Sequence, residues 1–379
     1  MDDRAYVLSR IKALRPSAKF VVYSHSSEFT DESANLGQGY HYVNLYDEDI
    51  DSNRLKTQRG QVIVHNTYIS SFAYNLFSCW RYCHDPAGSF QQQLESLVKH
   101  NLKKFYAEQL LHRRNNIFAR AILLETLLYE QQMMIPVINK RKTDTEFDRS
   151  VEIASQLMSS VISFHEMGHF YLLYQPTAWD EIVSDFRVIQ TFYPQAIVHQ
   201  SPTQIEEIRC DIMSVVFCLS QYTQLCGRET CLRLIAFSYT AYAVMFSLTR
   251  SAEATVNAQR HILEQVDFSS IKRPDCGFEY VFNIDIEMLK RCQLMLEFCQ
   301  ALAHDEGFTL FSETGSLPLP PTILHDFMKY VDIIMDSDDQ NARGMALLVA
   351  ESLHEHPAGI QYLYLNSKVF ISNRTELVP

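Results

Sequence analysis

Hydrophobic residues recur with a helical period along most of this 379-residue chain. Amphipathic stretches at Phe90–Arg114 and Asn116–Val137 predict two long helices. A third stretch begins at Asp144 or Thr145, either of which can cap a helix, and carries apolar residues on one broad face. Pro176 follows this stretch and is expected to end it. The pattern therefore predicts a mainly α protein.

More helices are expected towards the C-terminus, where the same period continues between short polar connectors. Ser201 or Thr203 is a suitable N-cap for the second of them. The expected ranges are Trp179–Tyr193, Gln204–Leu225, Leu234–Thr249, Ala252–Val266, Ile284–Ala303, Thr322–Met335 and Asn341–His354.

The first 88 residues show a different pattern, with shorter apolar runs and more loop-forming residues. Lys19–Ser24 and Gln61–Ile69 are expected to form strands, and Tyr40–Tyr46 an extended segment. Pro86 lies in a helix-breaking stretch that marks a boundary. We therefore expect a small α/β N-terminal region (1–88), a helical zinc-binding catalytic core (89–270) and a helical C-terminal region (271–379) that ends in a strand at Gln361–Ile371.

Leu234–Thr249 contains no charged residue and could be read in two ways. It is shorter than the roughly 20 residues that a helix needs to span a bilayer, and it holds several Ser, Thr and Tyr residues. A helix buried in the centre of the protein is the favoured interpretation. A membrane-attached protein is the alternative.

The composition indicates which partners and which cellular compartment are expected for the protein. The net charge of −12 argues against a general nucleic-acid-binding protein, which would normally be basic. The N-terminus opens with two acids and lacks an apolar segment, so no secretory signal is expected. The nine cysteines lack a paired framework, and the Cys79/Cys83 pair has no second pair to complete a metal site. The sequence predicts a cytoplasmic protein with reduced thiols.

The third helix carries the chemistry that stands out. His165, Glu166 and His169 form an H-E-x-x-H pattern, with Gly168 between the histidines. Residues four apart lie on one face of a helix, so both imidazoles can reach a single Zn²⁺. Glu166 can then stand beside the open coordination position and accept a proton from water there. Gly168 suits a helix lying close under a substrate cleft.

A catalytic zinc needs a third protein ligand, and the helix after Pro202 offers acids for it. Glu207 and Asp211 are four residues apart on a face that continues with apolar side chains. A carboxylate can complete the ligand set, and a second one can hold a ligand histidine by its other nitrogen. The neighbouring Glu206 points about 100° away and is expected to pair with Arg209 at the surface.

With these two motifs the chain resembles the gluzincin metallopeptidases, in which H-E-x-x-H is followed by a helix bearing E-x-x-x-D. The resemblance covers residues 145–225 and identifies no single family. The metzincin continuation is excluded because Leu172 and Gln175 stand where that group has glycine and histidine. The resemblance implies a zincin-like core in which His165, His169 and Glu207 bind zinc, Glu166 is the base and Asp211 orients a ligand.

The expected function is therefore that of a zinc-dependent metallopeptidase that hydrolyses peptide bonds in a restricted protein or peptide substrate. A non-catalytic helical interaction protein with a structural or degenerate zinc site is one alternative. A zinc hydrolase acting on non-peptide amides is another. Spacing alone does not choose the residue that stabilises the oxyanion. Its candidates are Tyr239, Tyr242, Arg260 and His261.

Overall fold

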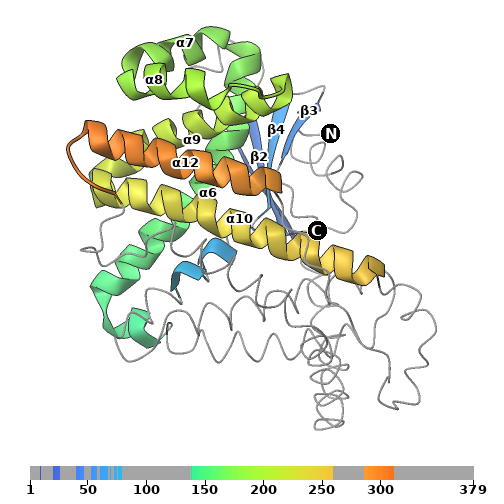
Figure 1. The fold of residues 1–379 in the computed structure, drawn as a ribbon. Helices are drawn as coiled ribbons and strands as arrows, with labels where there is room; N and C mark the ends of the chain where they lie inside the picture. Colours follow the sequence, from blue (N-terminus) through green and yellow to red (C-terminus); the bar gives the residue numbers. More distant parts are fainter. Residues whose placement is uncertain are drawn as a thin grey trace.

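A computed structural model of the chain describes residues 20–25, 40–46, 53–57, 60–66, 137, 139–258 and 286–310, with a few helical positions between 9 and 78. Most of these residues are helical, which confirms the mainly α prediction (Figure 1). The helices are α6 (Thr145–Tyr174), α7 (Pro176–Asp185), α8 (Arg187–Ala196), α9 (Pro202–Cys226), α10 (Arg228–Ala258) and α12 (Ile286–Asp305).

A mixed four-stranded sheet lies in the N-terminal part of the chain. Its strands are β1 (Phe20–His25), β2 (Tyr40–Tyr46), β3 (Asn53–Thr57) and β4 (Gly60–Asn66), in the order β1-β2-β4-β3. Only the central pair, β2 and β4, is parallel. The three predicted strand segments are confirmed, with β4 ending three residues early. β3 was not predicted because its polar sequence NRLKT lacks the apolar alternation of a half-buried strand.

Helix α6 begins where the sequence predicts. The side chain of Asp144 accepts a hydrogen bond of 2.9 Å from the backbone N–H of Phe147, as an N-cap does. The helix packs against β3 and β4 on one side and most extensively against α9 (Figure 1). It ends before Pro176, which occupies the first turn of α7, where its missing N–H is tolerated.

The single helix predicted at Trp179–Tyr193 is wrong, because the structure has two helices there. Phe186 is extended, with φ −117° and ψ 102°, and separates α7 from α8. Apolar side chains on both sides of the break, such as Ile182 and Ile189, pack on the same core. Since burial continues across the break, the periodicity of the sequence does not reveal it. Helix α8 also continues to Ala196, three residues beyond the predicted end at Tyr193.

Helix α9 begins with the predicted cap. Ser201 accepts a hydrogen bond from the backbone N–H of Gln204, and the Gln204 side chain accepts one in return from the backbone N–H of Ser201. Across from α6, Ser214 donates a 2.6 Å hydrogen bond to the backbone carbonyl of Val161. These contacts set the start of α9 and its position along α6, and so they position the acids that it carries.

Gly168 permits the close approach of α6 to α9. A Cβ added at Gly168 would lie 2.9 Å from the Cα of Cys210 and 3.1 Å from its Cβ. Real Cβ atoms do not come this close to backbone, so the two helices could not hold this distance with any larger residue. The glycine between the histidines is therefore needed for helix packing and not, as the sequence suggested, for space under a cleft.

Gly168→Ala should destabilise the protein although alanine is the better helix former. Overpacking costs about 1–3 kcal/mol, which exceeds the gain of about 1 kcal/mol in helix propensity. The free energy of unfolding, measured by denaturant titration, should fall, and zinc affinity should fall with it because the helices must separate. Gln156→Ala, on the exposed face of α6, is the control and should change stability by about 0.5 kcal/mol or less. An unchanged or raised stability of Gly168→Ala would contradict this packing role.

Helix α10 contacts α6, α9 and α12. Its segment Arg228–Arg250 is long and apolar enough to cross a membrane, but 94% of its most apolar window is buried inside the protein. The prediction of a buried helix at Leu234–Thr249 is thus confirmed. The separate helix predicted from Ala252 is wrong up to Ala258, because α10 continues without a break to that residue.

The described residues test the prediction about the cysteines but leave several other predictions untested. Six cysteines in the described part are free thiols, as expected: Cys210, Cys218, Cys226, Cys231, Cys292 and Cys299. The division into three regions stays a prediction. The predicted features outside the described residues are Phe90–Arg114, almost all of Asn116–Val137, Thr322–Met335, Asn341–His354, Gln361–Ile371, Cys79, Cys83, Arg260 and His261.

Candidate metal centre

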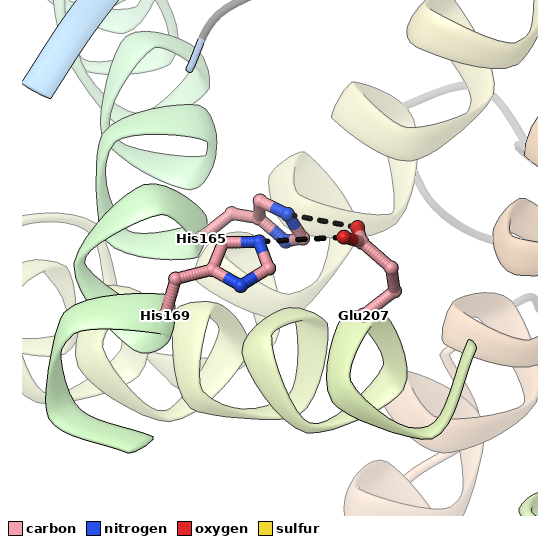
Figure 2. Close-up of side chains that lie close together, drawn as sticks. All are labelled: His165, His169 and Glu207. Atoms are coloured by element: carbon pink, nitrogen blue, oxygen red, sulfur yellow. Dashed lines mark ion pairs between the residues drawn. The ribbon is translucent and has the colours of Figure 1, made fainter. Parts of the chain in front are cut away.

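The structure brings His165 and His169 of α6 together with Glu207 of α9 (Figure 2). The Nε2 atom of His165 lies 3.2 Å from one carboxylate oxygen of Glu207. The Nε2 atom of His169 lies 3.4 Å from the other. The three side chains are partly exposed, at 13%, 14% and 26%. Two segments about forty residues apart in the chain thus place three donor groups at one partly accessible point.

These three residues could hold a metal ion, since one donor atom from each lies within 4.8 Å of the other two. Zinc bonds of 2.0–2.1 Å in tetrahedral geometry place neighbouring ligand atoms about 3.3 Å apart. Each imidazole nitrogen lies near that distance from the carboxylate, at 3.2 and 3.4 Å, but from a different oxygen of Glu207, so the carboxylate faces both imidazoles. Two imidazoles and one carboxylate are a donor set that zinc accepts. The residues present therefore fit a zinc ion.

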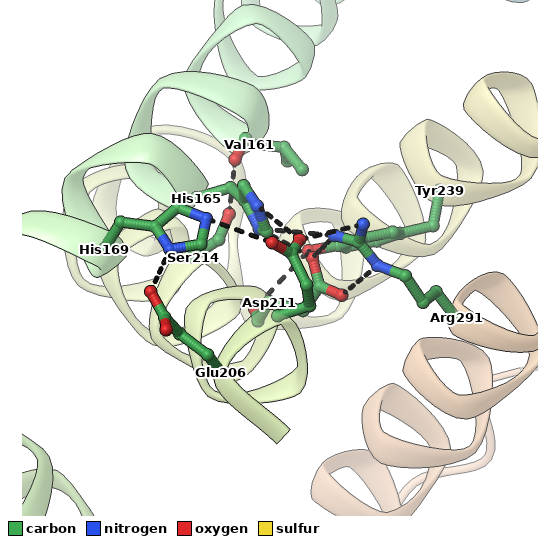
Figure 3. A network of polar contacts seen from close by, with 9 residues as sticks. Val161, His165, His169, Glu206, Asp211, Ser214, Tyr239 and Arg291 are labelled. Atoms are coloured by element: carbon green, nitrogen blue, oxygen red, sulfur yellow. Dashed lines mark hydrogen bonds and ion pairs between the residues drawn. The ribbon is translucent and has the colours of Figure 1, made fainter. Parts of the chain in front are cut away.

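Each histidine is held by a carboxylate at its other ring nitrogen (Figure 3). Asp211 lies 2.9 Å from Nδ1 of His165. Glu206 lies 2.8 Å from Nδ1 of His169. A carboxylate at Nδ1 favours a proton on that nitrogen, which leaves the lone pair of Nε2 for a metal. The expected place of Asp211 beside a ligand histidine agrees with this geometry.

The expectation for Glu206 needs correction. The sequence predicted a surface ion pair between Glu206 and Arg209, but the carboxylate of Glu206 turns to His169 instead. Arg209 donates a hydrogen bond of 2.5 Å to the hydroxyl of Tyr193 and lies over the ring of Trp179. Arg209, which the sequence of α9 suggested as the partner of Glu206, therefore contacts aromatic side chains of α7 and α8 instead. Both neighbouring acids, Glu206 and Glu207, therefore belong to the centre.

Arg291 of α12 is a part of the centre that the sequence analysis missed. Its Nε and Nη2 atoms donate to the two carboxylate oxygens of Asp211, at 2.9 and 2.8 Å. Its Nη1 atom lies 3.0 Å from Glu207. A sequence signal existed, because Arg291 lies between Met288 and Met295 on the helical face that packs against the core. A cation on such a face calls for a buried acid, but the sequence does not say which one.

Arg291→Ala should strongly destabilise the zinc-free protein. It leaves Asp211, which is 1% exposed, without its main counter-charge, and breaking a buried ion pair costs about 3–5 kcal/mol. Arg291→Lys should recover part of this loss, because lysine keeps the charge but not the two parallel hydrogen bonds. Thermal unfolding of both variants measures the effect. Lys290→Ala, an exposed neighbour on the same helix, is the control, and an equal loss there would contradict the assignment.

Two candidates for oxyanion stabilisation hold structural positions. The hydroxyl of Tyr239 is buried and donates to a carboxylate oxygen of Asp211 at 3.2 Å. Tyr242 is also buried and donates to the backbone carbonyl of Met158. Burial raises the pKa of both phenols well above the usual range. The hydroxyl of Tyr239 is thus engaged with Asp211, and that of Tyr242 with the backbone of α6.

The charges of the centre shift the pKa values of its members. Burial alone would lower the pKa of His165, but the charge of Asp211 and the hydrogen bonds to Asp211 and Glu207 raise that pKa to about 9. Burial alone would raise the pKa of Glu207, yet hydrogen bonds from His165 and His169 hold it far below its usual range. For Asp211, the charge of Arg291 outweighs burial and lowers the pKa. The centre thus keeps its carboxylates charged and attracts a positive charge.

Glu166 differs from the other acids of the centre. Its side chain is buried, at 7% exposure, and burial raises its pKa. Glu166 follows His165 directly in α6, and its charge interacts with those of His165, His169 and Glu207. No hydrogen bond joins Glu166 to another residue in the described part of the chain. Its oxygens are not among the fully buried unpaired atoms of the described residues, so water can still reach the carboxylate.

In the described part of the chain three side chains form a group that could hold a metal ion, and no fourth His, Cys, Asp or Glu joins them there. Comparisons with models of protein families, with curated proteins and with solved structures found no match to this chain.

Proposed function

We propose that the protein is a zinc-dependent metallopeptidase that hydrolyses peptide bonds in a restricted protein or peptide substrate. The observation that carries the proposal is the arrangement of His165, His169 and Glu207, with both Nε2 atoms turned to the Glu207 carboxylate. A zinc ion held there supplies a Lewis acid that polarises the scissile carbonyl and lowers the pKa of water.

Side chains of α6 and α9 transfer the proton and orient the imidazoles. Glu166 is the general base that takes a proton from the attacking water and delivers it to the leaving amine. No described residue hydrogen-bonds its carboxylate and the oxygens are not fully buried, so they are available for that proton. Asp211 and Glu206 hold the two imidazoles in the orientation that presents Nε2.

The same arrangement supports a gluzincin-type, zincin-like core. His165, Glu166 and His169 match the H-E-x-x-H helix, while Glu207 and Asp211 match the E-x-x-x-D helix. The packing of α6 between α9 and the mixed sheet is consistent with such a core. This assignment rests on the motifs and their geometry alone, without support from a related protein.

The geometry favours catalysis over the structural-zinc alternative. A structural zinc site normally has four protein ligands, whereas the described residues bring three together. It also has no use for a buried acid such as Glu166 beside the ligands. Activity on non-peptide amides would use the same residues and is distinguished by its substrate.

Comparative N-terminal proteomics tests the proposal. Cells expressing the wild type should contain new protein N-termini that are missing from cells expressing Glu166→Gln at the same level. A small set of cleaved proteins is expected for a restricted enzyme. Identical N-termini in the two samples, with zinc present in the purified wild-type protein, would contradict peptidase activity and favour the non-peptide alternative.

A further inference from the structure

A pocket of about 210 Å³ lies between the first turns of α9 and the exposed side of α12. Glu207 and Arg291 form part of its wall, so the pocket adjoins the metal centre. Sites for whole small molecules usually measure roughly 300–1,000 Å³. This pocket is smaller, and its size suits a single side chain of a longer ligand that lies across the centre.

The pocket carries a negative balance of charge. The charge of Arg291 is already compensated by Asp211 and Glu207. The other charged residues of the lining are Glu287, Glu297 and Lys290, all exposed. Among the described residues none of these three has an ion-pair partner. Two acids against one base make the pocket more attractive to a cation than to an anion.

The uncharged lining suits a long side chain with several N–H donors. Ile208 and Leu294 provide apolar surface for a methylene chain. The amide oxygens of Gln200 and Gln293 can accept hydrogen bonds at the pocket. Lysine carries three N–H donors and arginine five at the end of such a chain, and neither offers an acceptor. An apolar side chain bound in the pocket would displace water from these amide oxygens and offer them no hydrogen bond in return.

We propose that this pocket binds the side chain of an arginine or lysine residue adjacent to the scissile bond of a peptide substrate. Its place next to the bond rests on the proposed function, while the binding of a basic side chain can be measured without any hydrolysis.

The binding test uses three capped amino acids: the N-acetyl amides of arginine, norleucine and glutamate. Saturation-transfer NMR measures their affinities for the zinc-loaded protein. The arginine compound should bind most tightly. Glu287→Gln/Glu297→Gln should weaken it by about three- to tenfold, which lies within the range for the loss of two exposed ion pairs. Lys290→Gln should strengthen it, since a like charge is removed; misfolding cannot produce such a gain.

The control is Glu181→Gln/Asp305→Asn, which changes the net charge equally at exposed positions that do not line the pocket. It should leave the affinity for the arginine compound within about twofold, because distant surface charges are largely screened. Equal affinity for arginine and norleucine, or equal losses in the control and the pocket variant, would overturn the proposal.

The cleavage test uses a peptide library digested by wild type and by Glu287→Gln/Glu297→Gln. Arginine or lysine should be enriched at one fixed position beside the cut by wild type, and this enrichment should fall about three- to tenfold for the variant. Cleavage without such a position would overturn the pocket's place beside the bond. A library left uncut by wild type would count against the peptidase, and the NMR affinities would still decide whether the pocket takes a basic side chain.

Discussion

Glu166→Gln should reduce peptide cleavage by about 10²–10⁴-fold, the usual contribution of a general base. The amide has the same shape as the carboxylate but accepts no proton. Zinc content should stay at the wild-type level, because Glu166 is placed beside the ligands and is not one of them. Stability should be equal or higher, because a buried charge without a hydrogen-bonding partner in the described residues is replaced by a neutral group. Cleavage kinetics, metal analysis and thermal unfolding of the same preparation measure all three quantities.

Glu152→Gln is the matched control for this change. It makes the same substitution on the exposed side of α6, away from the histidines, and should cleave like wild type. The decisive outcome is the rate of Glu166→Gln relative to this control. If both variants cleave equally fast, Glu166 is not the base, however well the metal binds.

Removal of the metal ligands should have the second large effect. The wild-type protein should contain about one zinc per chain, and His165→Ala/His169→Ala should lose it. Glu207→Ala should also empty the site and abolish activity, because its carboxylate faces both Nε2 atoms. Zinc retained in full by the double histidine variant would show that the ion binds elsewhere.

The residues behind the ligands should give smaller and graded losses. Loss of a carboxylate that orients a ligand histidine lowers metal affinity by about 10–100-fold. Asp211→Ala should lie at the upper end, because Asp211 is buried and also holds Arg291. Glu206→Ala should lie at the lower end, because the side chain of Glu206 is 50% exposed and water can replace part of its contact with His169. The surface ion pair expected from sequence had suggested almost no effect for Glu206.

Zinc titrations monitored by a competing chelator give the order of these affinities, with Glu181→Ala of α7 as an exposed acid outside the centre. An affinity of Glu206→Ala equal to that of the control would show that the contact with His169 does not support metal binding. A Glu206→Ala variant that loses zinc more completely than Glu207→Ala would reverse the assignment of the third ligand.

The features that were predicted correctly depend on spacing and contacts between residues that are close in the chain. The spacing of His165 and His169 places them on one face of any helix that contains both. The N-caps at Asp144 and Ser201 are contacts within three residues, so α6 and α9 begin where predicted. The choice of Glu207 over Glu206 to face both Nε2 atoms followed from helix phase and the apolar side chains that share its face.

Long-range packing decided what the sequence left open or wrong. Arg291 binds an acid 80 residues away, and no local pattern names that acid. Glu206 turned to His169, 37 residues away, because aromatic residues of α7 and α8 took Arg209. The break at Phe186 is not visible in the hydrophobic pattern of the sequence, because both helices bury their apolar faces in one core.

The sequence by itself therefore determined the main helices and the three side chains that come together as candidate metal ligands, since both depend on spacing within a helix. The tertiary structure decided that Glu206 joins Asp211 in contacting the histidines, how closely α6 approaches α9 at Gly168, and where the pocket beside Glu207 lies. Those features depend on the distance and rotation between helices. These are set by the complementary shapes of many side chains together and by no single stretch of the chain.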